Sequence, residues 1–304
     1  MDPEILKFDP QPGVAETLSP GLRRVLAPNP SPMTFRGTNT YLVGTREIAV
    51  IDPGPKDPKH LEAILAALEP GQTISHILVT HAHVDHSPLA ADLAGRCGAE
   101  VWAFGDAYAG RSAVMQDLSA RGLAGGGEGV DAHFRPDRCL VDGEEINGDG
   151  WTLKTICTPG HFGNHIAFGW EDVCFTGDHV MGWASSLVSP PDGDLTDFMG
   201  SCHRLNARKW ATFHSGHGAP ITDPNARLDW LIEHRMGREA EILAALSHGP
   251  ARAYDLACQI YTDTPTALMG AATRNVFAHL VDLTGKKLVS PQGNLESEAV
   301  FERL

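Results

Sequence analysis

Three histidines and an aspartate fall within six residues of this chain, between positions 81 and 86. Imidazole nitrogens and carboxylate oxygens are the groups through which proteins bind zinc and similar divalent metals. Four such side chains rarely occur so close together in an ordinary surface loop. The segment therefore predicts a metal centre, with enough ligands to contact two metal ions. These ligands are His81, His83, Asp85 and His86.

The elements beside this cluster are predicted to be a strand and a helix. Residues 73–80 are β-branched and apolar toward their carboxyl end, which favours a short buried strand. After the cluster, Pro88 can be accommodated in the first turn of a helix whose apolar positions include Leu89, Leu93 and Ala94. The four ligands are thus expected on a strand-to-helix loop, where α/β proteins tend to place their sites.

Three later segments each add one possible ligand. His161 and Asp178 each follow a strand-like run, and His217 lies between two glycines, where another backbone can approach closely. Each of these signals is weak alone. In this order after residues 81–86, they indicate strands whose ends converge on one site.

Strand-like and helix-like segments alternate on both sides of residues 81–86, after a proline-rich leader over residues 10–32. This pattern predicts two sheets packed between helical layers. A glycine-rich run from Gly122 to Gly129 is expected to be a flexible surface loop, either beside the site or as a plain connection. The strands are predicted at 39–43, 48–51, 73–80, 100–103, 151–157, 166–168, 173–176 and 210–213, and the helices at 60–68 and from 88 onward.

The composition changes near Asp223, where a helix-rich tail begins. Helices that end in a terminal hairpin predict a winged helix-turn-helix. We therefore divide the chain into a catalytic domain at 1–222 and a small winged-helix-like α+β domain at 223–304, which suits a length of 304 residues. The predicted helices of the tail cover 228–246, 253–260 and 267–283, and its strand-like pieces cover 286–289 and 299–301.

Composition and charge narrow the class of protein. No run of about 18 apolar residues occurs, as a membrane span would need, and the amino terminus lacks the basic and apolar segments of a signal peptide. The six cysteines are scattered without Cys-x-x-Cys spacing, which favours free thiols and a cytoplasmic location. The net charge of -14, from 38 acidic against 24 basic side chains, argues against nucleic acid as the main partner.

On these motifs the chain resembles the metallo-beta-lactamase superfamily, in the branch whose His-x-His-x-Asp-His motif is shared by glyoxalase II and related hydrolases. The resemblance extends from about Thr38 to Pro220 and includes two smaller motifs, at residues 37–42 and 51–54. It implies an αββα metallo-beta-lactamase sandwich with the site along one edge of the sheets. The ligands that it implies are His81, His83 and His161 for a first metal, Asp85, His86 and His217 for a second, and Asp178 as a bridge.

The implied chemistry is metal-dependent hydrolysis. Imidazole and carboxylate ligands without a thiolate suit two divalent zinc ions, while iron and manganese remain open. Two metals can share a water and lower its pKa, so that a metal-bridging hydroxide attacks an ester, thioester or related small-molecule substrate. Asp85 and Asp178 are the candidate catalytic residues, and Asp85 could also steer the proton of the nucleophile. Beta-lactamases of the main class carry a cysteine where Asp178 stands, which argues against antibiotic hydrolysis.

Three further residues are candidates for supporting the ligands. Asp52 either orients a ligand imidazole or caps the Pro-Gly turn that follows it. His179 either faces the pocket or is packed and hydrogen-bonded in the core. His165 either supports the site or serves in packing. The residue types alone leave these alternatives open.

The tail and the segments 176–183 and 190–195 are similar to a bacterial and mitochondrial β-lactamase-like protein subgroup, whose mitochondrial members include an endoribonuclease acting on single-stranded RNA. A tail in this position could cover the substrate entrance. Trp183, Ser185 and Ser186 are then pocket candidates, unless they only pack the loop after the predicted bridge.

Three functions follow as hypotheses. The leading one is a binuclear hydrolase of ester, thioester or related small-molecule substrates. The second is a metal-dependent endoribonuclease on single-stranded RNA, which the subgroup favours and the acidic charge opposes. The third is a non-catalytic winged-helix regulator, which leaves seven ligand positions unexplained. Because Arg274 is the one Lys or Arg in the third predicted tail helix, we expect a lid or a homodimer interface there rather than a surface that binds DNA.

Overall fold

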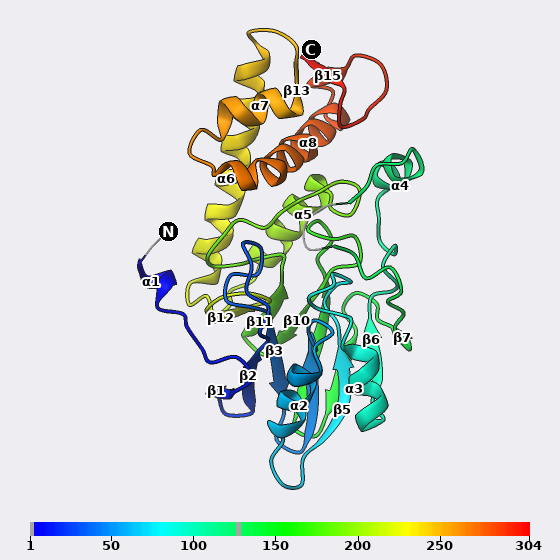
Figure 1. Cartoon of the computed structure of the whole chain (residues 1–304), viewed down its shortest axis with the longest axis vertical. Helices are drawn as coiled ribbons and strands as arrows, with labels where there is room; N and C mark the ends of the chain where they lie inside the picture. The colour runs from blue at the N-terminus through cyan, green and yellow to red at the C-terminus, as the bar shows by residue number, and fades with distance from the viewer. Residues whose placement is uncertain (1–2, 126–128) are drawn as a thin grey trace.

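Two β-sheets packed face to face, with helices on both outer faces, form the larger part of the molecule (Figure 1). The computed structural model describes residues 3–125 and 129–304, so positions 126–128 of the predicted glycine-rich loop lie outside the described residues. The helices of this part are α1 (Pro3–Leu6), α2 (Pro58–Ala66), α3 (Ala90–Cys97), α4 (Ala113–Ala120) and α5 (Leu195–Asn206).

The first sheet follows the order of the chain. Within the described residues it has seven strands, antiparallel from β1 to β4 and parallel from β4 to β7. The parallel half carries the loop after β5 at its carboxyl edge. The strands are β1 (Ala15–Ser19), β2 (Leu22–Leu26), β3 (Asn39–Val43), β4 (Glu47–Ile51), β5 (Thr73–Leu78), β6 (Glu100–Ala103) and β7 (Arg138–Cys139).

The second sheet runs in the order β12-β11-β10-β9-β8. Its pairs are antiparallel except β11 and β12, which are parallel and therefore end at the same edge. The strands are β8 (Glu145–Gly148), β9 (Trp151–Cys157), β10 (Ile166–Trp170), β11 (Val173–Gly177) and β12 (Thr212–Ser215).

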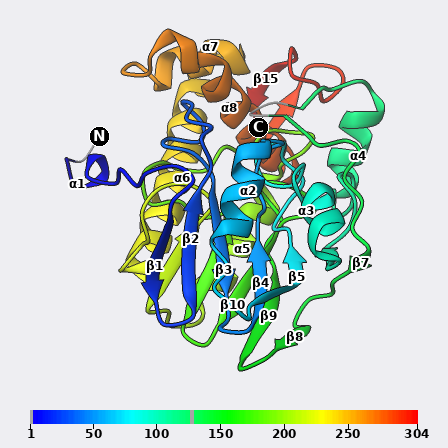
Figure 2. The same ribbon diagram turned by 60° about the horizontal axis from the view of Figure 1, so that its bottom comes forward.

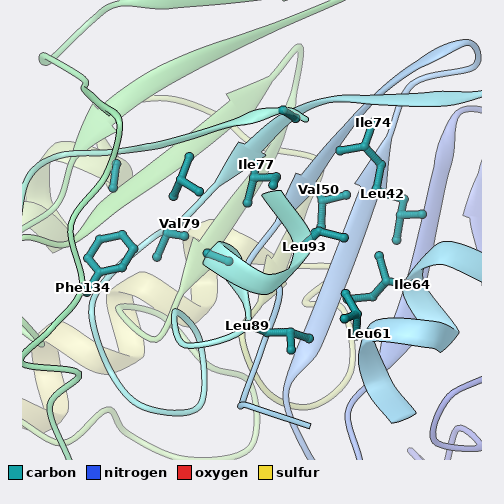
Figure 3. Close-up of a cluster of buried hydrophobic side chains, with 14 of the residues drawn as sticks. Leu42, Val50, Leu61, Ile64, Ile74, Ile77, Val79, Leu89, Leu93 and Phe134 are labelled. Atoms are coloured by element: carbon teal, nitrogen blue, oxygen red, sulfur yellow. The ribbon is translucent and has the colours of Figure 1, made fainter. Parts of the chain in front are cut away.

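Alternation along the strands fills the layers on both sides of each sheet. In β3, Leu42 faces outward and joins the cluster of Leu61 and Ile64 from α2, whereas Tyr41 and Val43 face the second sheet (Figure 3). Figure 2 shows α2 and α3 over the outer face of the first sheet. On the other side, α5 and the beginning of α6 (Pro224–Leu246) pack under the second sheet. The predicted αββα sandwich is confirmed.

A small α+β unit follows the sandwich. Its strands form a sheet in the order β13-β15-β14, and its core joins residues such as Leu256, Val276 and Phe301. The helix α6 packs against both parts, because Leu228 belongs to the core of the sandwich and Ile242 to the core of the small unit. The assignments of a winged helix and of a boundary at 222/223 stay predictions. The elements are β13 (Ala251–Arg252), α7 (Ala253–Ile260), the short 3-10 helix η1 (Thr266–Leu268), α8 (Met269–Gly285), β14 (Val289–Pro291) and β15 (Val300–Arg303).

One expectation about an element is wrong, and two strands were not predicted. The proline-rich leader contains β1 and β2, because the prolines lie before, between and after these strands, with Pro20 in their turn. The strand expected at 286–289 begins only at Val289, because α8 continues to Gly285 and Lys287 takes a positive φ of 59° after it. Among the described residues, no helix is both long and apolar enough to cross a membrane.

Candidate metal centre

All seven predicted ligands meet at one edge of the sandwich. Residues 81–86 follow β5, His161 follows β9, Asp178 follows β11 and His217 follows β12. Every one of the seven side chains is buried, with His161 the most exposed at 7%. The side chains divide into two groups whose ligand atoms lie within 4.8 Å of one another in each group.

The first group consists of His81, His83 and His161. The Nε2 atom of His81 lies 2.9 Å from Nδ1 of His83, and Nε2 of His161 lies 3.1 Å from the same Nδ1. Three imidazole nitrogens therefore converge on a common point. Nitrogens so close together are expected where imidazole lone pairs surround a cation.

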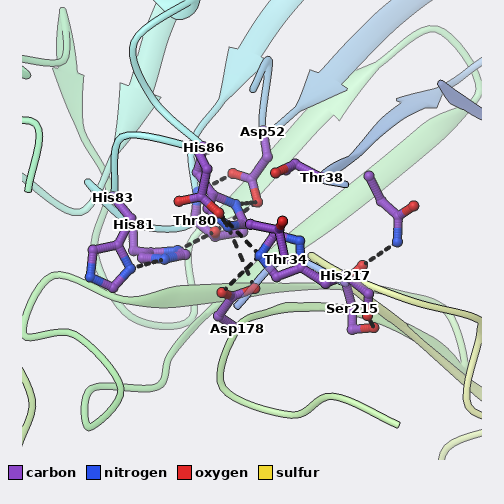
Figure 4. Close-up of polar contacts among 12 residues, drawn as sticks. Thr34, Thr38, Asp52, Thr80, His81, His83, His86, Asp178, Ser215 and His217 are labelled. Carbon is purple, nitrogen blue, oxygen red and sulfur yellow. Dashed lines mark hydrogen bonds and ion pairs between the residues drawn. The ribbon is translucent and has the colours of Figure 1, made fainter. Parts of the chain in front are cut away.

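The second group consists of Asp85, His86, Asp178 and His217. Nε2 of His217 lies 3.1 Å from Oδ2 of Asp85 and 3.2 Å from Oδ2 of Asp178, and Nε2 of His86 lies 3.5 Å from each of the two carboxylates (Figure 4). The same Oδ2 of Asp178 lies 3.9 Å from Nε2 of His161 in the first group. The carboxylate of Asp178 thus stands between the two groups.

A hydrogen-bond network from Asp52 orients two of the imidazoles. Its carboxylate accepts from the backbone N–H of Thr80 at 2.7 Å, from the Thr80 hydroxyl at 2.8 Å and from Nδ1 of His86 at 2.9 Å. Because the Thr80 hydroxyl donates to Asp52, Nδ1 of His81, 2.9 Å away, must donate to that hydroxyl oxygen. Both rings then carry their proton on Nδ1 and leave Nε2 for the site.

Backbone carbonyls orient two more ligands. Nδ1 of His161 donates to the carbonyl of Leu187 at 2.7 Å, and Nδ1 of His217 donates to the carbonyl of Gly37 at 3.0 Å. Each bond again leaves Nε2 toward the other ligands. Gly216 is required beside His217, because a Cβ there would lie 2.3 Å from Oδ1 of Asp178.

Burial and charge set opposite protonation states in the two groups. Burial lowers the pKa of His83 to about 3 and holds the pKa of His81 well below its usual range. In the second group, burial also disfavours the charged imidazoles, but Asp178 and Asp85 outweigh it and raise the pKa of His217 to about 10. The same carboxylates, with Asp52, hold the pKa of His86 well above its usual range. Two imidazolium protons therefore balance two carboxylates where no cation is bound.

Unpartnered buried atoms show that this donor set fits metal ions. Among the described residues, both carboxylate oxygens of Asp85, Oδ1 of Asp178 and Nε2 of His86 are buried without a hydrogen bond, and apart from Oδ1 of Asp85 each of them has an ion-pair neighbour within this group at 3.1 to 3.5 Å. A buried polar atom without a hydrogen bond costs about 1–3 kcal/mol, so such a concentration indicates a place where cations replace the two imidazolium protons. A pair of divalent cations would satisfy these atoms, and the assignment of each ligand to one cation stays a prediction.

The three residues proposed to support the ligands have different surroundings in the structure. Asp52 contacts His86 and thus holds a ligand. His179 is packed in the core, where its ring lies 4.4 Å from that of Phe198 between centroids and its Nε2 lies 3.5 Å from Sγ of Cys202. His165 packs against the ring of His81 at 5.1 Å, with Nδ1 on the hydroxyl of Thr158.

A cavity of about 210 Å³ lies between the loop 181–187 and the segment from Tyr261 through η1 into α8. Trp183 and Ser185 line it, whereas Ser186 is buried behind them and donates to the carbonyl of His179.

Three residues that orient the ligands were not predicted from the sequence: Thr80, Leu187 and Gly37. The threonine directly before His81 was a usable signal, but the other two act through backbone carbonyls, which any residue type could supply.

Comparison with known proteins gives consistent results along the chain. The model of a family described as the metallo-beta-lactamase superfamily matches residues 33–232. The chain is 32% identical over 268 residues to the beta-lactamase-like protein 2 homolog of Caenorhabditis elegans, covering 86% of this chain and 83% of that protein. It is 29% identical over 250 residues to the atrochrysone carboxyl ACP thioesterase of Passalora fulva, covering 78% of this chain and 65% of that protein.

Two solved structures extend the likeness over almost the whole fold. A metallo-beta-lactamase family protein from Thermus thermophilus superposes with a TM-score of 0.76 at 27% identity, covering 95% of this chain and 100% of that one. A beta-lactamase domain protein from Burkholderia ambifaria superposes with a TM-score of 0.81 at 22% identity, covering 100% of this chain and 99% of that one. The small α+β unit is therefore included in the shared fold.

Proposed function

Because the chain belongs to the metallo-beta-lactamase superfamily of hydrolases, we propose that it hydrolyses thioester or ester bonds of small-molecule substrates with two divalent metal ions. The first ion would be held by His81, His83 and His161. The second would be held by Asp85, His86 and His217, and Asp178 would contribute to both ions. Zinc is the ion we propose, since the ligands are imidazoles and carboxylates without a thiolate.

The position of Asp178 carries this proposal. One of its oxygens lies 3.2 Å from Nε2 of His217 and 3.9 Å from Nε2 of His161, so a single carboxylate reaches both groups. A structural site for one ion would need only four ligands and would have no use for a second group.

When bound, the two ions supply Lewis acidity toward water and toward the oxygen of the scissile carbonyl. The residues of the chain hold the ligands in fixed orientation and supply a proton acceptor. Oδ2 of Asp85 faces His217, while Oδ1 of Asp85 is buried without a partner among the described residues. Oδ1 is therefore the atom that we propose to accept the proton of the attacking water.

Support for a thioester comes from relatives and from charge. Three relatives at 29% identity are named as atrochrysone carboxyl ACP thioesterases, from Passalora fulva, Claviceps purpurea and a Cryptosporiopsis species. The net charge of -14 opposes a polyanionic substrate. Arg274, the basic residue of α8, contacts the carbonyl of Ala124 and the hydroxyl of Ser189, so it is already engaged within the molecule.

A hydrolase panel on the metal-loaded protein tests the proposal. The panel contains acyl thioesters of N-acetylcysteamine, S-lactoylglutathione, simple esters, a cephalosporin and single-stranded RNA. Removal of metal with a chelator and the variant Asp178→Asn serve as controls. We expect turnover of thioesters or esters that both controls abolish. Cleavage of RNA without thioester or ester turnover would support an endoribonuclease instead, and no activity with any loaded metal would overturn the proposal.

A further inference from the structure

The cavity between the two parts of the molecule has an apolar wall from each side. Met33 and Leu187 come from loops of the sandwich, and Leu268 and Ala271 come from η1 and α8. Among the described residues that line it, none carries a charge. The cavity therefore suits an uncharged, apolar group and would disfavour a phosphodiester backbone.

Two residues connect this cavity to the metal centre. Leu187 lines the cavity, and its carbonyl accepts the hydrogen bond from Nδ1 of His161. Trp183 lines the cavity as well, and its ring packs so closely on Gly218 that a Cβ there would lie 2.8 Å from Cδ1 of the indole. Gly218 directly follows the ligand His217. Two residues of the cavity wall thus contact His161 and the neighbour of His217, one on each side of the centre.

We propose that this cavity binds the apolar acyl group of the substrate and so selects medium-length or aromatic acyl groups. This inference rests on the proposed thioester or ester hydrolysis. An apolar cavity of about 150 Å³ is enough to bind benzene, so 210 Å³ accepts a ring with a short substituent or a chain of similar size. The space is too small for the thiol carrier in addition, which stays outside it.

The position of the cavity also gives the small α+β unit a role in selectivity. Tyr261, Leu268 and Ala271 come from this unit, whereas the seven predicted ligands come from the sandwich. Changes in the helices can therefore alter which acyl group is accepted while leaving the ligand atoms in place. The sandwich supplies the chemistry, and the unit around α8 supplies one wall of the acyl site.

Two variants with opposite effects test the acyl site. Ala271→Phe fills the cavity from α8, and Leu268→Ala enlarges it. Ala267→Phe is the matched control, because Ala267 is exposed on η1 and does not line the cavity. The substrates are N-acetylcysteamine thioesters from acetyl to decanoyl, together with benzoyl. The thermal melting curve of each variant is measured to check that the variant is folded.

For the native protein we expect kcat/KM to rise about fourfold for each added methylene until the cavity is full. In Ala271→Phe the ratio of octanoyl to acetyl kcat/KM should fall at least tenfold, whereas Leu268→Ala should shift the preferred chain to a longer one. Ala267→Phe should keep the native ratio. Equal ratios in all four proteins would overturn the acyl site and leave the proposed hydrolysis intact.

A binding measurement separates this inference from catalysis. The probes are S-alkyl thioethers of N-acetylcysteamine, which cannot be hydrolysed, titrated calorimetrically into native and Ala271→Phe protein. We expect the S-octyl thioether to bind the native protein at least tenfold more tightly than Ala271→Phe. If no thioester or ester is hydrolysed but this difference is found, the proposed function fails and the apolar site stands. Equal affinity in both proteins would contradict the site.

Discussion

The Nδ1–H of His161 donates a 2.7 Å hydrogen bond to the carbonyl of Leu187, whose residue also lines the apolar cavity. One loop therefore positions a predicted metal ligand and forms a wall of the proposed acyl site. The same loop is held from the other side, because Arg235 of α6 donates to the carbonyl of Ser186 and Asn275 of α8 accepts from the backbone N–H of Val188.

Removing Arg235 is expected to destabilise the protein. Its guanidinium is buried, contacts the carbonyl of Ser186 and Oδ1 of Asn275, and lies over the ring of Phe198. Arg235→Ala should lower the free energy of unfolding in urea by about 3 kcal/mol, since it leaves a void and an unpaired carbonyl. Arg238→Ala, on the same helix, loses a pair with the exposed Glu241 and a stacking contact with Tyr261, and should cost only about 1 kcal/mol. Similar losses in both variants would contradict the account.

Asp52→Asn should weaken metal binding without removing a ligand. The substitution replaces the carboxylate that accepts from His86 and Thr80, so the ligand rings lose their fixed tautomers. We expect a roughly 10- to 100-fold weaker zinc affinity in competition with a chromophoric chelator. Asp92→Asn, at an exposed position of α3, is the matched control and should bind like the native protein. An unchanged affinity in Asp52→Asn would show that the network does not support the centre.

Metal binding should release protons even at pH 8. The pKa of His217 is raised to about 10 and that of His86 lies well above its usual range, so both imidazoles are protonated in the metal-free protein. A bound cation needs neutral imidazole, so the two histidines should release about two protons per chain, beside the proton that a metal-bound water gives up. Titration of zinc into weakly buffered protein with a pH indicator measures them. Histidines of ordinary pKa, near about 6.5, would release almost none at this pH.

Acid should destabilise the metal-free protein between about pH 6.5 and pH 4. Burial lowers the pKa of His60 and of His214 to about 4, so the unfolded chain binds more protons than the native one as the pH falls through this window. The contribution of each histidine is fully present above its unfolded pKa of about 6.5 and is lost toward pH 4. Urea unfolding at several pH values measures this slope.

His214→Phe tests that assignment. The ring of His214 packs against Tyr41 and Phe175, with centroids 5.4 and 5.5 Å apart, and phenylalanine has a similar shape. The variant should lose up to about one proton, or about 1.4 kcal/mol per pH unit, from the dependence in this window. A slope equal to that of the native protein would mean that His214 is not held neutral by burial.

The sequence predicted the local features of the fold and site well, because they depend on short-range patterns. Residues 81–86 contain four ligand types within one loop, and the alternation at 151–157 matches β9. The strands β1 and β2 of the proline-rich leader were not predicted, although the prolines leave room for them and Pro20 lies in the turn between them. Proline excludes a residue from the ladder only where its N–H is needed.

Features that depend on tertiary contact were beyond the reach of the sequence. The carbonyl of Leu187 orients His161 across 26 positions, and a carbonyl leaves no mark in the residue type. Likewise, Met115 and Leu118 of α4 pack in the core of the small α+β unit, although most of that core lies far along the sequence. The cavity forms where loops of the sandwich meet residues 261–275 of the small unit, so only its loop residues Trp183 and Ser185 could be named in advance.

The metal stoichiometry of native protein and Asp178→Asn tests the central claim most directly. Each protein is stripped with a chelator, titrated with zinc, and assayed for thioester hydrolysis while its metal content is measured by mass spectrometry. We expect the native protein to bind two ions per chain and to gain activity with the second. Asp178→Asn should retain at most one tightly bound ion and lose at least about 100-fold in hydrolysis, since its amide cannot bridge two cations. A native protein that saturates with one ion, or an Asp178→Asn variant that binds two and hydrolyses at the native rate, would contradict a binuclear centre bridged by Asp178.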